Sequence, residues 1–172
     1  MEWHASLPST MSRAEELAPH APSGLVVVAD YQSLGRGTRG RRWHAPPGSC
    51  LMFTIVSHVP FSIDELEALP RRVSDAIART LAEDFGLACL VKEPNDVTVG
   101  GHKLCGVLCT SHLIGSDVAW ILCGVGLNTT MTVAQLPRND ATSLLLEGVA
   151  APRHDELLEQ LLARLTWLRD SA

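Results

Sequence analysis

The stretch that decides the fold class is Val97-Thr-Val-Gly-Gly-His-Lys-Leu-Cys-Gly-Val-Leu-Cys-Thr110. It contains two runs of β-branched and apolar residues, which are separated by the pair Gly100-Gly101. A two-residue glycine turn between such runs is a strong short-range sign of a β-hairpin. The stretch therefore predicts two antiparallel strands, over residues 97–99 and 102–110.

Four more segments outside this hairpin have the composition of strands. They are short and rich in β-branched and other apolar residues. Residues 50–57 form a nearly continuous apolar run, which predicts a strand that is buried on both faces. The four predicted strands span residues 24–30, 50–57, 87–91 and 118–123, and the last of them ends at Gly124-Val-Gly126.

Three segments are predicted to be helices. The longest begins at a capping box formed by Ser62 and Glu65, continues through apolar residues at helical spacing and ends before Gly86. Ser12, with an acidic residue three positions on, resembles a second capping box and predicts a short helix to about residue 18. Asp155 is expected to cap a last helix, whose apolar face packs on the core through Leu157, Leu158, Leu161, Leu162, Leu165 and Leu168.

Clustered hairpins with only one long helix between strands favour an α+β fold over a doubly wound parallel sheet. The chain has 172 residues and shows no internal repeat, low-complexity segment or linker. A chain of about 150 residues buries roughly 70% of the surface that its unfolded form exposes, which suffices for one core. We therefore expect a single domain over residues 1–172, with a mixed, largely antiparallel sheet packed with helices.

Composition and charge exclude several classes of protein. The chain is 46% hydrophobic and 19% charged, which excludes a disordered chain, and its net charge of −5 argues against general nucleic-acid binding. It has neither a run of about 18 apolar residues nor a secretory signal, so we expect a cytoplasmic protein without a membrane segment. The five cysteines are expected to be reduced core residues, and the seven histidines lack metal-ligand spacing, so no metal site is assigned.

The basic residues are unusual in kind and in placement. The chain has twelve Arg but only two Lys, and four of the Arg lie between positions 36 and 42 in a segment without acids. The loop Gly35-Arg-Gly-Thr-Arg-Gly-Arg-Arg-Trp43 places glycines among arginines, so that backbone N–H groups and guanidinium groups can both reach an anion. The loop is a candidate anion site, and a flexible, solvated basic loop is the alternative.

Three further motifs follow along the chain. Lys92-Glu-Pro-Asn-Asp96 has a stiffening proline and an Asn-Asp pair that could equally form an Asx-type turn into the hairpin. Lys103 begins an otherwise apolar strand in which Gly106 permits close approach of a ligand or a backbone; a lysine that reaches solvent from a strand end is the alternative. In Gly124-Val-Gly-Leu-Asn128 a strand ends in glycines and an amide that could contact the edge of a ring.

In this order and spacing, the motifs resemble the catalytic domain of the biotin protein ligases, within the biotin/lipoate ligase superfamily. The resemblance covers roughly residues 6–168 and also includes Ser9-Thr10, Gln32, Pro46, Gly48, Lys103-Leu-Cys-Gly-Val-Leu108 and Ala141-Thr-Ser-Leu144. It implies the fold of that domain, which is similar to class II aminoacyl-tRNA synthetases. It also implies that biotin and MgATP form biotinyl-5′-adenylate, from which biotin passes to a lysine of a biotin carboxyl carrier protein domain.

Carried over residue by residue, the resemblance implies a role for each matching position. Lys103, Arg39 and Arg41 would be catalytic, with Lys103 between the biotin carboxylate and the α-phosphate. Biotin would be bound by Ser9, Thr10, Met11, Gln32, Gly35, Arg36, Gly37, Thr38, Lys103 and Gly106. The nucleotide, as its Mg²⁺ complex, would be bound by Arg36, Arg39, Arg41, Trp43, Asn95, Asp96, Lys103 and Asn128. A homodimer through an exposed sheet edge is expected by analogy.

The sequence departs from the family pattern at three positions. Thr38 stands where an Arg is usual, Glu93 replaces a Trp and Met11 replaces an Asn. The loss of a guanidinium at position 38 predicts loose retention of the adenylate. The chain length leaves no room for an N-terminal DNA-binding domain or a C-terminal SH3-like domain, so no repressor is expected. The alternatives are a lipoate or octanoate ligase or transferase, and a degenerate, non-catalytic binder of biotin or nucleotide.

Overall fold

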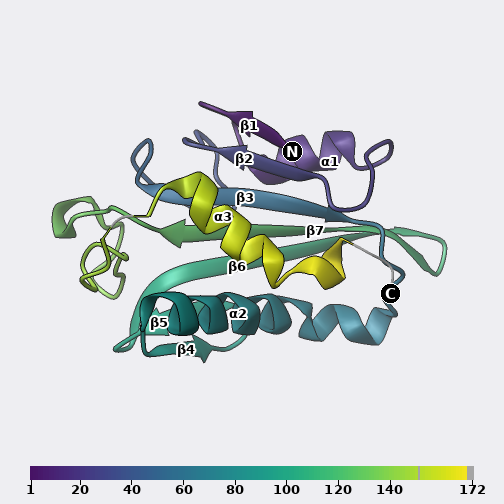
Figure 1. The fold of residues 1–172 in the computed structure, drawn as a ribbon. Helices are drawn as coiled ribbons and strands as arrows, with labels where there is room; N and C mark the ends of the chain where they lie inside the picture. The colour runs from purple at the N-terminus through teal and green to yellow at the C-terminus, as the bar shows by residue number, and fades with distance from the viewer. Residues whose placement is uncertain (151, 170–172) are drawn as a thin grey trace.

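A seven-stranded β-sheet forms the centre of the computed structural model, which describes residues 1–150 and 152–169. In chain order the strands are β1 (Glu2–His4), β2 (Val26–Ala29), β3 (Cys50–Ser57), β4 (Cys89–Lys92), β5 (Asp96–Val99), β6 (His102–Ile114) and β7 (Asp117–Asn128). In space they lie in the order β1-β2-β3-β7-β6-β5-β4, and all neighbours are antiparallel except β1 and β2 (Figure 1). The predicted α+β fold with a largely antiparallel sheet is confirmed. The predicted domain range includes residues 151 and 170–172, which lie outside the described part.

The hairpin that decides the fold class is formed by β5 and β6. Gly100 and Gly101 have φ angles of +56° and +84°, as a tight two-residue turn between antiparallel strands requires. The strand expected to end at Gly124 is longer than predicted. Gly124 pairs with Leu108, and Gly126 pairs with Gly106, so the glycines lie inside β7 instead of after it. The short edge strand β1 has no alternating pattern, and the sequence did not predict it.

The three predicted helices are present, with corrected starts for two of them. Helix α2 (Ile63–Phe85) begins at the predicted capping box and ends at Gly86, which has a φ of +70°. Helix α1 (Thr10–Leu17) begins at Ser9 and not at Ser12, because Ser9 has extended dihedral angles and its carbonyl accepts the first helical hydrogen bond. Helix α3 (His154–Ala163) has Arg153 as its N-cap, and the proposed cap, Asp155, lies in the first turn. The helix ends before Leu165 and Leu168, which were predicted on its apolar face; both are buried in the same core from the segment that follows, which includes the 3-10 turn Thr166–Leu168.

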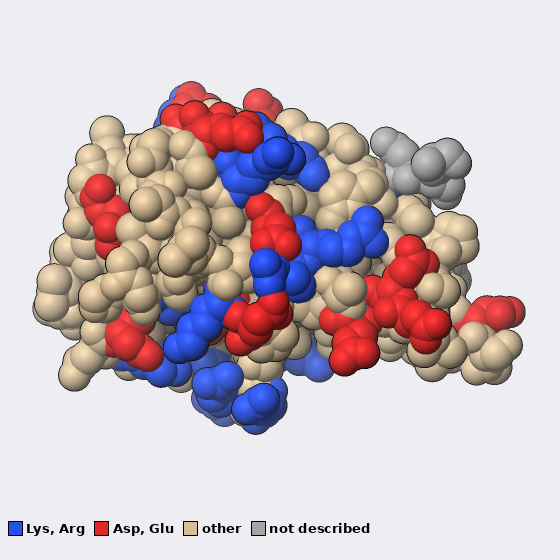
Figure 2. Space-filling view, turned by 90° about the horizontal axis from the view of Figure 1, so that it is seen from below, with Lys and Arg blue, Asp and Glu red and all other residues tan. Residues whose placement is uncertain are grey.

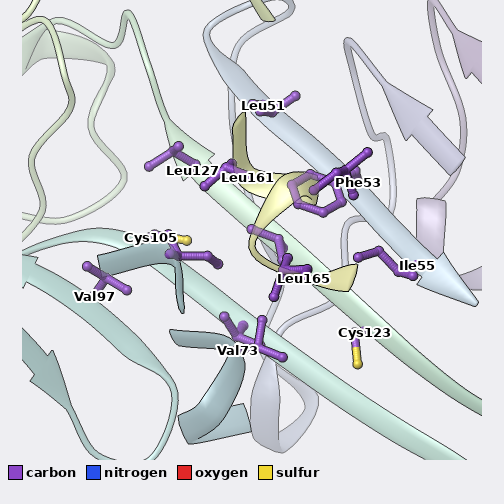
Figure 3. Close-up of a cluster of buried hydrophobic side chains, with 14 of the residues drawn as sticks. Leu51, Phe53, Ile55, Val73, Val97, Cys105, Cys123, Leu127, Leu161 and Leu165 are labelled. Carbon is purple, nitrogen blue, oxygen red and sulfur yellow. The ribbon is translucent and has the colours of Figure 1, made fainter. Parts of the chain in front are cut away.

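The sheet separates one large hydrophobic cluster from two smaller ones on its other face. Along β3, Leu51, Phe53 and Ile55 point to the side of α2 and α3, where they meet Leu161 and other buried side chains (Figure 3). Val56 points to the opposite side and packs with α1. Figure 1 shows α3 across the middle of the sheet and α2 along its β4–β6 end. Because α1 covers only β2, β3 and β7, the same face is open over β6, and this opening positions the site described below.

The face of the molecule that carries α2 has interleaved charges of both signs (Figure 2). Ion pairs on this helix include Arg71 with Asp75 and Arg79 with Glu83. This side of the molecule therefore offers no broad basic surface of the kind that nucleic acid favours. In the described part of the chain, no helix combines the length and apolar character that crossing a bilayer demands.

Candidate active site

A cavity of about 370 Å³ lies on the open face of the sheet, between the start of α1, the 35–43 loop and strands β6 and β7. Most of the residues that the sequence predicted for a site line it. They are Ser9, Thr10, Met11, Gln32, Arg36, Gly37, Thr38, Arg41, Trp43, Asn95, Lys103, Gly106 and Asn128. Three predicted site residues, Gly35, Arg39 and Asp96, are not part of its lining.

Backbone hydrogen bonds between its two sides close the 35–43 loop. Trp43 N donates to Gly35 O at 3.0 Å, and Gly37 N donates to Arg41 O at 2.8 Å, so the two sides of the loop pair like strands. A Cβ atom on Gly35 would lie 2.5 Å from the Trp43 carbonyl oxygen, which explains the glycine at this position. These contacts show that the loop has a defined backbone, although the side chains of its four arginines are exposed, and the anion site stays a prediction.

The arginines of this loop line two hollows. Arg36, Arg41 and Arg42 line both the cavity and a second hollow of about 380 Å³, whereas Arg39 lines the second hollow and not the cavity. Arg39 has a left-handed φ of 57°, and it is exposed and absent from the cavity lining. Arg36 pairs with Glu15 of α1 at 3.3 Å, and Arg41 Nη2 donates to Thr38 Oγ1 at 3.1 Å.

The cavity has a buried part, formed by Ser9, Thr10, Met11 and Gln32. Gln32 Oε1 accepts hydrogen bonds from Thr10 N at 2.7 Å and Thr10 Oγ1 at 3.2 Å, which fixes the amide. The Gln32 Nε2 group faces the sulfur of Met52, a weak acceptor. Ser9 is 1% exposed, and its hydroxyl has no hydrogen-bond partner among the described residues. The buried part thus keeps hydrogen-bonding capacity that the protein itself does not use.

The cavity also has a cationic part, formed by Arg36, Arg41, Trp43 and Lys103. The Lys103 Nζ atom lies 2.5 Å from Asp96 Oδ1 and 5.6 Å from the centroid of the Trp43 ring, so a carboxylate and an aromatic face hold the ammonium group. The backbone of Lys103 is fixed as well, because its N–H donates to Asp140 O and its carbonyl accepts from Thr142 N, both at 2.8 Å. Both the side chain and the backbone of Lys103 are therefore held in place.

The two predicted asparagines line the cavity, and their side-chain NH₂ groups donate hydrogen bonds to backbone carbonyls of the cavity wall. Asn95 Nδ2 donates to Val107 O at 2.6 Å, across the β5–β6 hairpin. Asn128 Nδ2 donates to Thr142 O at 2.8 Å, and this side chain is only 3% exposed. Both amide NH₂ groups thus hold the walls together. Of the three departures from the family pattern, Thr38 and Met11 line the cavity, whereas Glu93 lies outside the lining and pairs with Arg71 of α2.

Several lining residues were not predicted as site residues, among them Gly124, Gly126, Arg138 and Ala141. The two glycines alternate along β7, and this period of two was the signal that places both on one face of the sheet. Arg138 and Ala141 come from the segment that runs beside Lys103. No local pattern in the sequence indicates that this segment returns to the cavity, although the family resemblance includes Ala141-Thr-Ser-Leu144.

The lining favours the binding of anions over catalysis by a side-chain nucleophile. Among the lining residues there are several cations and no carboxylate. Burial raises the pKa of the Cys50 thiol, next to the cavity wall, to about 12, and it also raises the pKa of Cys105. These thiols are thus protonated near neutral pH. Among the described residues, no three His, Cys, Asp or Glu side chains gather where they could hold a metal ion.

Comparison with known proteins identifies relatives of this chain. The profile of the biotin/lipoate A/B protein ligase family matches residues 3–128. The bifunctional ligase/repressor BirA of Bacillus subtilis is 30% identical over 146 residues, which are 83% of this chain and 45% of BirA. The biotin–[acetyl-CoA-carboxylase] ligase of Mycobacterium tuberculosis is 35% identical over 152 residues, 83% of this chain and 53% of that protein. The chain thus spans about half the length of these curated relatives.

Solved structures agree with the sequence comparison. The biotin protein ligase of Leishmania major in complex with biotinyl-5-AMP has a TM-score of 0.78 and 26% identity, over 95% of this chain and 72% of that one. The biotin protein ligase of Aquifex aeolicus in complex with biotin and ATP has a TM-score of 0.76 and 26% identity, over 96% of this chain and 68% of that one. The fold, the matched residues and the relatives agree: this chain belongs to the biotin/lipoate A/B protein ligase family.

Proposed function

We propose that this chain catalyses the reaction of a biotin protein ligase. A biotin carboxylate oxygen attacks the α-phosphorus of ATP, the bond to the β-phosphate breaks, and biotinyl-5′-adenylate and pyrophosphate form. The amine of an acceptor lysine then attacks the acyl carbon, an amide bond forms, AMP leaves and the amine gives up a proton to water. The relatives solved with biotin and ATP and with biotinyl-5-AMP support this assignment.

The observation that carries the proposal is that one cavity joins a buried, uncharged polar part to a cationic part. Biotin has a polar ring at one end and a carboxylate at the other, and ATP is a polyanion. A cavity of this kind can hold the ring in its buried part and bring the carboxylate and the α-phosphate together between Lys103, Arg36 and Arg41. Holding both reactants in line supplies much of the acceleration, because it removes the entropic cost of their encounter.

The buried part favours biotin over lipoate or octanoate. The Ser9 hydroxyl and the Gln32 NH₂ group have unused hydrogen-bonding capacity there. A ureido ring offers a carbonyl and two N–H groups to such partners, whereas a dithiolane ring or an alkyl end offers none. Leaving a buried polar group unpaired costs about 1–3 kcal/mol, so these residues discriminate between the ligands.

In this proposal the residues of the cationic part act on the developing negative charge at the α-phosphorus. Lys103 is preorganised by Asp96 and Trp43, so its ammonium group needs little rearrangement to interact with that charge. Arg36 and Arg41 supply forked donors on the opposite side. ATP enters as its Mg²⁺ complex, and the ion belongs to the substrate. Asn95 and Asp96 lie on the nucleotide side, where Asn95 braces the wall and Asp96 holds Lys103.

The acceptor in this proposal is a lysine of a biotin carboxyl carrier protein domain, as the resemblance implies. The proposal places the reaction in a reducing compartment such as the cytoplasm, because the five cysteines of the chain are free thiols, which are typical of such a compartment.

Biotin-dependent ATP–pyrophosphate exchange tests the proposal. The chain is supplied with MgATP, labelled pyrophosphate and biotin, lipoate or octanoate, and Lys103→Ala is compared with Arg79→Ala. Arg79 is an exposed residue of α2 whose one ion pair among the described residues is with Glu83, so its loss controls for the removal of a positive charge. We expect exchange with biotin alone, its loss in Lys103→Ala and its retention in Arg79→Ala.

Each other outcome has a defined meaning. Exchange with lipoate or octanoate but not with biotin would replace the proposal by the lipoate-branch alternative. Binding of biotin without exchange would replace it by a non-catalytic binder. Equal exchange in the wild type and in Lys103→Ala would show that adenylate formation does not need Lys103.

A further inference from the structure

Three glycines form a strip without side chains on the floor of the cavity. Gly106 of β6 pairs directly with Gly126 of β7, and Gly124 lies two residues earlier on the same face of β7. All three line the cavity. We call them the glycine strip. Unlike the turn glycines, none of the three has a positive φ angle, so the backbone conformation does not require glycine at these positions.

Contacts across the cavity explain the glycines instead. A Cβ atom on Gly126 would lie 2.6 Å from Cε2 and 2.7 Å from Cζ2 of Trp43, well inside contact distance. A Cβ atom on Gly106 would lie 3.0 Å from Cζ3 of the same ring and 3.0 Å from Lys103 Nζ. The Trp43 ring thus rests directly on the backbone of the strip, and this resting position places its face toward Lys103.

Gly124 has a different neighbour. A Cβ atom there would lie 2.7 Å from Sδ and 3.1 Å from Cγ of Met11. Met11 is 3% exposed and packs on its other side with Val27, Val56 and Leu122. A methyl group at position 124 would therefore push the Met11 side chain into the cavity, because the packed cluster blocks the other directions.

The two β7 glycines thus support different parts of the cavity, although they lie only about 7 Å apart along one strand. Met11 belongs to the buried part, and Trp43 belongs to the cationic part. We propose that Gly124 and Gly126 are positioning residues that set the two substrate subsites independently. Gly124 sets the subsite of the acyl substrate through Met11, and Gly126 sets the subsite of the nucleotide through Trp43. This assignment of substrates rests on the proposed function.

Steady-state exchange kinetics of Gly124→Ala and Gly126→Ala test the proposal. The two variants carry the same substitution on the same face of one strand, so each is the matched control of the other. We expect Gly124→Ala to raise the KM for biotin about tenfold or more with little change in the KM for ATP, and Gly126→Ala to do the reverse. A structural weakening of the strand would shift both constants together.

Rescue variants identify the side chain that carries each effect. Adding Met11→Ala to Gly124→Ala, or Trp43→Ala to Gly126→Ala, removes the clash and also covers the case in which a single variant does not fold. We expect Met11→Ala to return the KM for biotin of the Gly124→Ala protein toward that of Met11→Ala alone, a coupling that a double-mutant cycle measures. Equal shifts of both constants, or no coupling between positions 11 and 124, would overturn the proposal.

The proposed function and this inference fail separately. If the wild type shows no biotin-dependent exchange, the proposed function fails, and titration of biotin and of ATP into the same variants still measures the two subsites. Selective weakening of one ligand by each variant would then support the division of the cavity, and weakening of both or neither would overturn it.

Discussion

Ser9 places a hydroxyl in the buried part of the cavity where no described protein group satisfies it. In the ligand-free protein this hydroxyl makes no hydrogen bond to the described residues, and under the proposed function it would gain one when biotin binds. We expect Ser9→Ala to leave the melting temperature unchanged or higher and to weaken biotin binding about 3- to 10-fold. Calorimetric titration measures the affinity, with the exposed Ser33→Ala as control. An unchanged affinity together with a lower melting temperature would show that Ser9 is only structural.

Thr38 lines the cavity and accepts a hydrogen bond from Arg41, so a guanidinium at this position would face the same space. An added charge-assisted contact is worth about 1.5–3 kcal/mol. We therefore expect Thr38→Arg to release biotinyl-5′-adenylate about 10- to 100-fold more slowly, with less stray labelling of lysines. Thr166→Arg adds the same charge at an exposed position outside both hollows and is the control. Equal leakage from the wild type and Thr38→Arg would contradict the expectation.

At the residue scale, the motifs predicted which side chains gather, but not how each one points. Lys103 and Trp43 are far apart in the sequence, and only the family resemblance implied that they share a site. Arg39 has a left-handed backbone angle and lies outside the cavity lining, and no composition rule anticipates either feature. The pairing of Lys103 with Asp96 depends on a register shift between β5 and β6, another feature that a sequence pattern does not contain.

At the scale of elements, the two predicted capping boxes give a direct comparison. Ser62 caps α2 reciprocally with Glu65, whereas Ser12 lies inside α1. We expect Ser62→Ala to lower the free energy of unfolding by about 1 kcal/mol. We expect Ser12→Ala to change it by a few tenths at most, since alanine suits a helix interior. Chemical denaturation measures both variants, and an equal loss in the two would contradict the assignment of the caps.

The first residue of α3 makes the stability of this helix depend on pH. Burial lowers the pKa of His154 below its ordinary value of 6.5, against the opposing pull of Asp30 and Asp155. The unfolded chain then binds more protons than the folded one, so stability is lost as the pH falls through and below about 6.5.

Replacement of His154 tests this dependence. Its Nε2 atom lies 2.8 Å from Thr129 Oγ1, and glutamine can keep a hydrogen bond there. We expect the melting temperature of His154→Gln to fall less than that of the wild type between neutral and mildly acidic pH. Parallel curves for the two proteins would rule His154 out as the source.

A strand or helix could be predicted from the sequence where a local rule fixes its ends. It could not be predicted where pairing with distant strands fixes them. Gly100-Gly101 turns the β5–β6 hairpin because positive φ angles suit glycine. Gly124 and Gly126 were misjudged as the end of a strand, since the rule that glycine weakens strands ignores pairing on both sides and a cavity that excludes side chains. Strand β1 has too few residues for any pattern to develop.

At the scale of the whole molecule, the cavity is lined by residues of a chain that spans about half the length of its curated relatives. The acceptor domain and a homodimer remain predictions from the resemblance. The free edges of the sheet are β1 and β4, and a dimer through either edge would bury backbone groups there. Sedimentation of the chain with and without biotin and MgATP measures the oligomeric state. A monomer under both conditions would contradict the expected homodimer.

The measurement that tests the central claim most directly is a single turnover analysed by mass spectrometry. The chain is mixed with biotin and MgATP, and a biotin carboxyl carrier domain is then added. We expect biotinyl-5′-adenylate to form on the protein first, and one biotinyl group to appear on a single carrier lysine as the adenylate disappears. The absence of the adenylate in a folded protein that binds both biotin and ATP would contradict the claim that this cavity joins them.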